Sequence, residues 1–112
     1  MKSRVRRAEA VEPYVPVARV EEVPPGSSKV VVVAGHIVAL FNVDGEFHAL
    51  SNTCLHRGGP VGEGYLDGEV ITCPWHGWQY DVRSGRNLLN PLARLKQYPV
   101  KVEDGHVLVA PA

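Results

Sequence analysis

The sequence KVVVVAGHIVALFN, from Lys29 to Asn42, contains two aliphatic runs separated by a glycine. Dense valine and isoleucine favour strands, and a short glycine-containing connection between two such runs predicts a β-hairpin. We expect strands over Lys29–Ala34 and Ile37–Asn42, with a tight turn at Gly35-His36. This interrupted stretch is the longest apolar one in the chain and is far shorter than the roughly 20 residues of a membrane helix, so no membrane span is expected.

The same signal continues towards the C-terminus. Asp-Gly pairs, which favour tight hairpin turns, begin at Asp44, Asp67 and Asp104, each before a short apolar run. The further strands that we expect cover Phe47–Leu50, Val70–Thr72, Gln97–Glu103 and His106–Ala110. Short strands joined by glycine-containing turns, without a helical period, predict an all-β fold, either a small sandwich or a barrel.

Two segments depart from this pattern, at about residues 52–64 and 73–79. The first contains several glycines and a proline, and the second is a short loop beside a strand. Loops held over a rigid scaffold often carry functional residues, so we expect these two to form a separate site-bearing subdomain.

The composition is that of an ordinary globular domain, with 45% hydrophobic and 21% charged residues in 112. We expect one domain over residues 13–112, preceded by a flexible polar arm over residues 1–12. Twelve basic residues balance twelve acidic ones, which gives no sign of nucleic-acid binding. The N-terminus lacks the apolar run of a signal peptide, so a cytoplasmic location is expected.

The charges are nonetheless unevenly spread. Five basic residues and no acidic one lie from Arg83 to Lys101, whereas Asp44 to Glu69 holds five acids against Arg57 alone. Such an asymmetry can steer a charged protein partner.

The chain's two cysteines lie in the two unusual loops, and each is followed closely by a histidine, as Cys54-x-His56 and Cys73-x-x-His76. Two thiolates and two imidazoles can bind zinc or an iron–sulfur cluster. Structural zinc sites usually use wider spacings than Cys54-x-His56, which favours the cluster. In a third interpretation both cysteines are ordinary buried apolar residues, which requires both paired histidines to be incidental.

The two loops resemble a known family. Cys54-Leu55-His56-Arg57-Gly58 and Cys73-Pro74-Trp75-His76-Gly77-Trp78 are similar to the two cluster-binding loops of Rieske proteins, and the likeness covers about Val15 to Pro111. It implies a Rieske-type fold and one [2Fe–2S] cluster per chain. By this resemblance Cys54 and Cys73 bind the inner iron, and His56 and His76 bind the outer iron near the surface.

The resemblance also implies roles for neighbouring residues. Tyr80 stands where the family has a tyrosine that can bond a cysteine sulfur, although an ordinary inward-facing aromatic accounts for it equally well. Asn90-Pro91-Leu92 resembles the loop that covers the cluster. High-potential members carry an extra disulfide, and a serine where this chain has Trp78. We therefore expect a potential in the lower part of the roughly −150 to +300 mV Rieske range.

Other residues near and outside the loops have two interpretations each. The loop glycines either allow close backbone approach and positive φ or are plain loop residues; they are Gly58, Gly59 and Gly77. The two tryptophans either shield the cluster or belong to the core; they are Trp75 and Trp78. The remaining histidines are expected to be surface residues or to have their hydrogen bonds satisfied within the protein, and not to be ligands; they are His36, His48 and His106.

The resemblance implies a one-electron carrier, a Rieske-type ferredoxin. We expect a monomer that docks transiently, near His56 and His76, with a flavin-dependent reductase and with a terminal oxygenase such as an aromatic ring-hydroxylating dioxygenase. Only about 36 residues follow His76, too few for the catalytic domain of longer family members. Two alternatives are a small subunit of an assimilatory nitrite reductase, whose relatives often lack the ligands, and an oxygenase component made as a separate chain.

Overall fold

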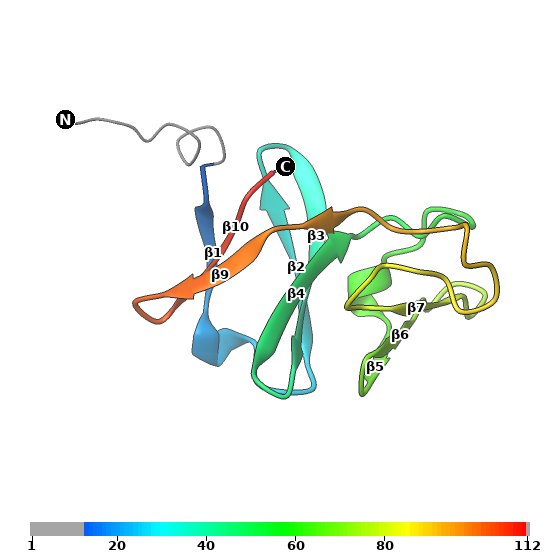
Figure 1. The fold of residues 1–112 in the computed structure, drawn as a ribbon, viewed down its shortest axis with the longest axis horizontal. Helices are drawn as coiled ribbons and strands as arrows, with labels where there is room; N and C mark the ends of the chain where they lie inside the picture. The colour runs from blue at the N-terminus through cyan, green and yellow to red at the C-terminus, as the bar shows by residue number, and fades with distance from the viewer. Residues whose placement is uncertain (1–12, 112) are drawn as a thin grey trace.

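The computed structural model describes residues 13–111, and the arm predicted over residues 1–12 lies outside that range. Strands and two short 3-10 turns make up its regular structure (Figure 1). In chain order these are β1 Val15–Arg19, η1 Val20–Glu22, β2 Ser28–Val33, β3 His36–Val43, β4 Glu46–Ser51, η2 Val61–Glu63, β5 Tyr65–Asp67, β6 Val70–Thr72, β7 Gln79–Asp81, β8 Gln97–Tyr98, β9 Val100–Glu103 and β10 His106–Val109. The predicted all-β class is confirmed.

The predicted hairpin within Lys29–Asn42 forms as β2 and β3, but its turn lies one residue earlier than predicted. Val33 pairs with His36, so the turn residues are Ala34 and Gly35, and His36 begins β3. Both turn residues have positive φ, 49° and 83°, as a type I′ hairpin turn requires. The turn was misplaced because alanine seldom adopts this conformation.

The predicted strand over Gln97–Glu103 is two strands. Pro99 separates β8, which pairs with β4, from β9, which pairs with β10. Proline has no N–H to donate to a ladder, and here it marks the point where the chain passes from one sheet to another. The turn predicted at Asp67-Gly68 is also shifted, since Asp67 pairs with Val70 and the connection is Gly68-Glu69.

The strands form three antiparallel sheets arranged one after another along the molecule (Figure 1). A three-stranded sheet has the order β1-β10-β9, a four-stranded sheet has β2-β3-β4-β8, and a second three-stranded sheet has β5-β6-β7. The middle sheet is buried on both faces at β3. Val38 and Leu40 pack towards the β1-β10-β9 sheet, while Ala39, Phe41 and Val43 pack towards the two loops and the β5-β6-β7 sheet.

The loop-bearing subdomain is therefore a separate layer built on the middle sheet. Its first loop ends in the 3-10 turn η2, and its second loop ends at Trp78, because Gln79 already belongs to β7. The predicted loop boundary at residue 79 is one residue too long. Within residues 13–111, no helix has the length and apolar character needed to cross a bilayer.

An arginine ties this layer to the middle sheet. Arg83 lies between Glu46 in the β3–β4 hairpin and Glu69 in the β5–β6 turn, with nitrogen–oxygen distances of 2.5 and 3.1 Å. The two carboxylates raise the pKa of Arg83, and the hydrogen bond from Arg83 is the main cause that lowers the pKa of Glu46. Part of the charge asymmetry seen in the sequence is thus paired within the molecule.

Candidate metal centre

Each of the two cysteine loops is closed by its own cysteine. The backbone N–H of Cys54 donates to the carbonyl of Gly59 at 2.9 Å, and that of Cys73 donates to the carbonyl of Trp78 at 2.8 Å. In both loops the acceptor lies five residues after the cysteine. Two turns of the same span, one following β4 and one following β6, therefore hold the thiols at comparable positions.

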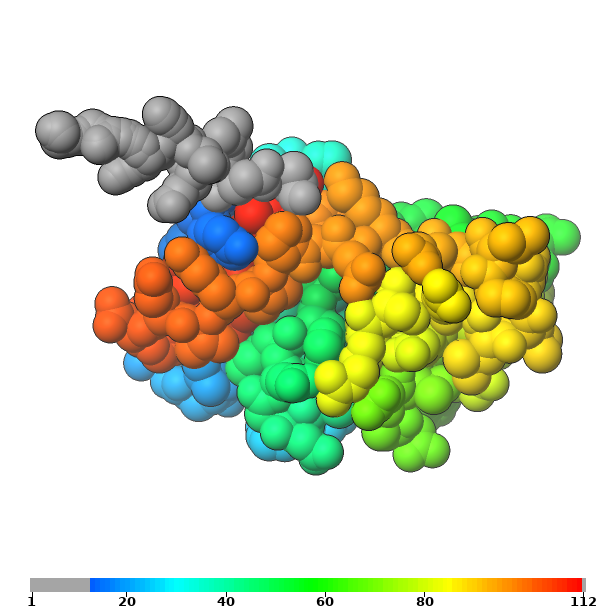
Figure 2. All heavy atoms as spheres, in the orientation of Figure 1, coloured from blue at the N-terminus to red at the C-terminus, as the bar shows by residue number. Residues whose placement is uncertain are grey.

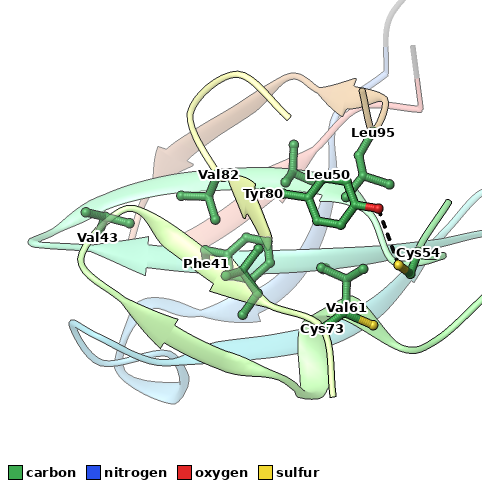
Figure 3. Close-up of a cluster of buried hydrophobic side chains, with 11 residues drawn as sticks. Phe41, Val43, Leu50, Cys54, Val61, Cys73, Tyr80, Val82 and Leu95 are labelled. Atoms are coloured by element: carbon green, nitrogen blue, oxygen red, sulfur yellow. Dashed lines mark hydrogen bonds between the residues drawn. The ribbon is translucent and has the colours of Figure 1, made fainter. Parts of the chain in front are cut away.

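Both thiols are buried. Cys54 and Cys73 are 2% and 1% exposed and belong to the core between the middle sheet and the loops, where Figure 3 places them at one edge of the cluster of side chains. Burial is the main cause that raises the pKa of Cys73; the neighbouring Cys54 thiol adds to this effect, and a backbone hydrogen bond at Trp75 opposes it. Neither cysteine forms a disulfide.

The two loop histidines lie together on the outer side. The imidazole rings of His56 and His76 are 4.9 Å apart between centroids and meet edge to face at 85°. His76 is exposed and has a φ of 64°, a conformation that L-residues seldom adopt and that accumulates at functional sites. Burial, then His76 and then Arg57, lower the pKa of His56, which favours the neutral ring that metals bind.

One ring nitrogen of His56 lacks a partner. The Nδ1 atom is buried, and no hydrogen-bonding group within residues 13–111 reaches it. Buried polar atoms are nearly always satisfied, so an orphaned imidazole nitrogen beside a second imidazole indicates a missing ligand. A metal ion would supply it.

Tyr80 links the site to the core. Its side chain is fully buried, and its hydroxyl lies 3.3 Å from the Sγ of Cys54 and accepts the backbone N–H of Leu55 at 3.2 Å (Figure 3). Because that N–H occupies the oxygen as an acceptor, the O–H is free to donate to the sulfur. Burial raises the pKa of Tyr80 far above its ordinary value, so the phenol stays protonated. Both interpretations of Tyr80, sulfur partner and core aromatic, hold together.

The loop glycines are there for geometric reasons. Gly58 and Gly77 have φ of 75° and 74°, in the left-handed region. A Cβ on Gly59 would lie 2.8 Å from Cys73 Sγ and 2.9 Å from Trp75 Cβ, so only glycine lets the first loop lie against the second.

The sequence did not reveal the contact that Trp78 makes. Its indole stacks on the His56 imidazole, with centroids 4.6 Å apart and an interplanar angle of 15°. Trp78 also packs against the core. The stack could not be inferred from spacing, because it joins residues of two different loops.

The other singled-out residues lie around or away from this centre. Asn90 lines a groove with His76 and Trp78, so the loop at Asn90-Pro91-Leu92 lies beside the second cysteine loop; that it covers a cluster remains a prediction. The three remaining histidines are elsewhere: His36 in β3, His48 in β4 beside Glu46, and His106 in β10.

The donor set suits a cluster with two irons. Within residues 13–111 no group of three or more His, Cys, Asp or Glu side chains is placed to hold a metal ion by itself. The candidate donors instead form an inner thiol pair and an outer imidazole pair. A [2Fe–2S] cluster with two cysteine and two histidine ligands needs this division. The fold and the site together define an iron–sulfur protein.

Comparison with known proteins agrees. Residues 13–99 match the Rieske [2Fe–2S] domain, and the chain belongs to this family. It is 36% identical over 97 residues to a ferredoxin component of naphthalene 1,2-dioxygenase/salicylate 5-hydroxylase systems from Ralstonia sp., covering 86% of this chain and 93% of that one. It is 44% identical over 92 residues to a biphenyl dioxygenase ferredoxin subunit from Pseudomonas sp. strain KKS102, covering 80% and 84%.

A solved structure has the same fold. In a complex of reduced oxygenase and oxidised ferredoxin of carbazole 1,9a-dioxygenase, one chain superposes with a TM-score of 0.80 at 33% identity, covering 87% of this chain and 92% of that chain. The cofactor of the present chain is accordingly one [2Fe–2S] cluster.

Proposed function

We propose that this protein is a one-electron carrier, a Rieske-type ferredoxin that takes electrons from a flavin-dependent reductase and delivers them to a terminal oxygenase of an aromatic ring-hydroxylating dioxygenase system. When bound, the [2Fe–2S] cluster accepts and releases one electron. The observation that carries the proposal is the arrangement of the candidate ligands from inside to outside, with buried thiols in the core and an exposed imidazole at the tip.

We propose Cys54, His56, Cys73 and His76 as the four ligands. The buried thiols would anchor the inner iron to the core, where Tyr80 donates a hydrogen bond to one of them. The imidazoles would hold the outer iron, with the orphaned Nδ1 of His56 as one donor. His76, exposed at the tip, is the ligand that a partner would approach most closely.

The relatives support a carrier that works in such a system. The two curated relatives described above are named as a ferredoxin component and a ferredoxin subunit of dioxygenase systems, and the solved relative is in a complex with an oxygenase. The presence of all four candidate ligands argues against the alternative of a nitrite reductase subunit, whose relatives often lack them.

Spectroscopy tests the centre directly. Anaerobically purified protein should contain two irons and two acid-labile sulfides per chain, as one [2Fe–2S] cluster requires. The electron paramagnetic resonance spectrum after dithionite reduction should have the low average g of a mixed Cys/His cluster. Stoichiometric zinc in place of iron would overturn the proposal.

A substitution tests the ligand set. His76→Ala should abolish the visible Rieske absorption and lower the stability, since cluster binding contributes to the folded state. His36→Ala, at an exposed position of β3, is the matched control and should retain the native spectrum. A native spectrum in His76→Ala would remove this residue from the ligands.

We also propose that residues 13–112 form one domain, preceded by the arm at residues 1–12, and that the protein acts as a cytoplasmic monomer. Two unpaired cysteines fit a reducing compartment. Size-exclusion of the native protein from its own cells tests the monomer, because a fixed stoichiometric partner would instead indicate a permanent subunit.

A further inference from the structure

The loop between β7 and β8 exposes two leucines at the tip of the molecule. Leu89 and Leu92 are 95% and 93% exposed, the two highest values among the large apolar side chains within residues 13–111, and Tyr65 follows at 78%. Three others at the same end are about half exposed: Leu55, Trp75 and Leu88. In the space-filling view the yellow and gold atoms of this loop form one end of the molecule, beside the green atoms of the first cysteine loop (Figure 2). Clustered exposed apolar side chains mark interaction sites.

Hydrogen bonds hold the two leucines in this position. The side-chain carbonyl of the buried Asn87 accepts the backbone N–H groups of Leu89 and Asn90, both at 2.9 Å. That of Asn90 accepts the N–H of Leu92 at 3.1 Å. A loop that is fixed before binding loses little entropy when it docks, so its leucines are presented at low cost.

This loop is adjacent to the proposed outer ligand. A groove runs between the loop and the second cysteine loop, with His76 and Trp78 on one side and Asn87, Leu89 and Asn90 on the other. The backbone N–H of Leu88 also donates to the carbonyl of Gln79 in β7 at 3.0 Å, which fastens the loop to the strand that follows the second cysteine loop. A partner that covers the leucines would therefore lie beside His76.

The flank of the loop is basic. The backbones of Arg86 and Arg94 form an antiparallel β-bridge at the base of the loop, and both side chains are exposed. Neither arginine takes part in an ion pair within residues 13–111, whereas Arg83 takes part in two. Unpaired charges at an interface rim steer association and fix orientation more than they add affinity.

We propose that this knob, defined as Leu89 and Leu92 with the flanking Arg86 and Arg94, is the docking element for the electron acceptor. It fits an apolar recess bordered by carboxylates on the terminal oxygenase. The assignment rests on the proposed function. The choice of the oxygenase over the reductase rests on the likeness of this chain to the ferredoxin of an oxygenase complex.

The experiment uses the holoprotein, reduced with dithionite and freed of excess reductant, mixed anaerobically with the terminal oxygenase purified from the protein's own cells. The rate of oxygenase reduction is followed against ferredoxin concentration by stopped-flow absorbance. The double variant Leu89→Ser/Leu92→Ser should weaken apparent binding at least about tenfold, which corresponds to about 1.4 kcal/mol. Leu89→Met/Leu92→Met should retain most of it.

Val32→Ser is the matched control, because Val32 is an exposed apolar residue of β2, in the middle sheet. It should leave the transfer rate unchanged. The cluster spectrum and reduction potential are measured in every variant, and a slower rate at native cluster content, compared at equal driving force, reports docking. Arg86→Gln/Arg94→Gln should slow transfer at low ionic strength, and the difference should vanish at high salt.

The outcomes separate the two proposals. If the native holoprotein reduces no oxygenase, the proposed function fails and this inference fails with it. If it does, and Leu89→Ser/Leu92→Ser transfers electrons as the native protein does, only the inference fails. Slower reduction of the variant by the reductase alone, or a native dimer that this variant dissociates, would assign the knob to another occupant and overturn the proposal.

Discussion

Replacing Tyr80 by phenylalanine should lower the reduction potential while leaving the cluster in place. The change removes the hydroxyl that lies 3.3 Å from Cys54 Sγ and keeps the buried ring. Hydrogen bonds to charged acceptors are roughly twice as strong as neutral ones, for which about 1 kcal/mol is typical. A cysteine that binds the cluster is a thiolate in both oxidation states, and the reduced cluster would carry one further negative charge, so we expect the bond to stabilise the reduced state by about 1 kcal/mol more than the oxidised state.

For a one-electron couple that difference corresponds to about 40 mV, because a tenfold change in the equilibrium constant is about 59 mV. The potential of Tyr80→Phe should therefore fall by about 40 mV in a potentiometric titration followed by electron paramagnetic resonance. Tyr98→Phe is the control: Tyr98 is 8% exposed and lies in the other core, against the β1-β10-β9 sheet, so it should leave the potential unchanged. An unaltered or raised potential in a fully loaded Tyr80→Phe protein would refute the reasoning.

Three further predictions concern the site and its attachment. Gly59→Ala should reduce the iron and acid-labile sulfide bound per chain, because the new Cβ would lie 2.8 Å from Cys73 Sγ; full cluster content at native stability would contradict this. Arg83→Gln should lower stability near neutral pH but not in acid. The pKa of Glu46 is lowered from 4.5 chiefly by its hydrogen bond with Arg83, so its contribution is present above pH 4.5 and is lost as the pH falls through the lowered value. Urea unfolding at several pH values measures this, and an equal deficit at every pH would disprove it. The reduction potential should fall as pH rises through the pKa of the bound imidazoles in the oxidised state, since reduction then takes up a proton; a flat voltammetric potential up to strongly alkaline pH would contradict histidine ligation.

The sequence predicted the fold class and the pairing of each cysteine with a histidine because both are local patterns. Val70–Thr72 was placed without error, while the first hairpin turn was misplaced by one residue since Ala34 adopts a positive φ that glycine was expected to take. Pro99 carried a readable signal for the break between β8 and β9, namely its missing N–H, and it was overlooked.

Contacts between distant segments could not be read in the same way. The stack of Trp78 on His56 depends on how two loops meet in space. The position of Arg83 between Glu46 and Glu69 joins two turns that are far apart in the chain. The order of charges along the chain suggested an electrostatic asymmetry here, and only the folded structure separates the charges that are paired internally from those that are free to meet a partner.

Both faces of β3 are buried, and its apolar side chains from Val38 to Val43 pack alternately into the two hydrophobic cores. Odd-numbered side chains from Ala39 to Val43 touch the compartment that contains the thiols, whereas Val38 and Leu40 touch only the supporting compartment. Because successive side chains of a strand point to opposite faces, substitutions at neighbouring positions change the packing of different cores. Substitutions at Val38 or Leu40 would therefore alter the core beneath the β1-β10-β9 sheet. Substitutions at Ala39, Phe41 or Val43 would alter the surroundings of the redox centre.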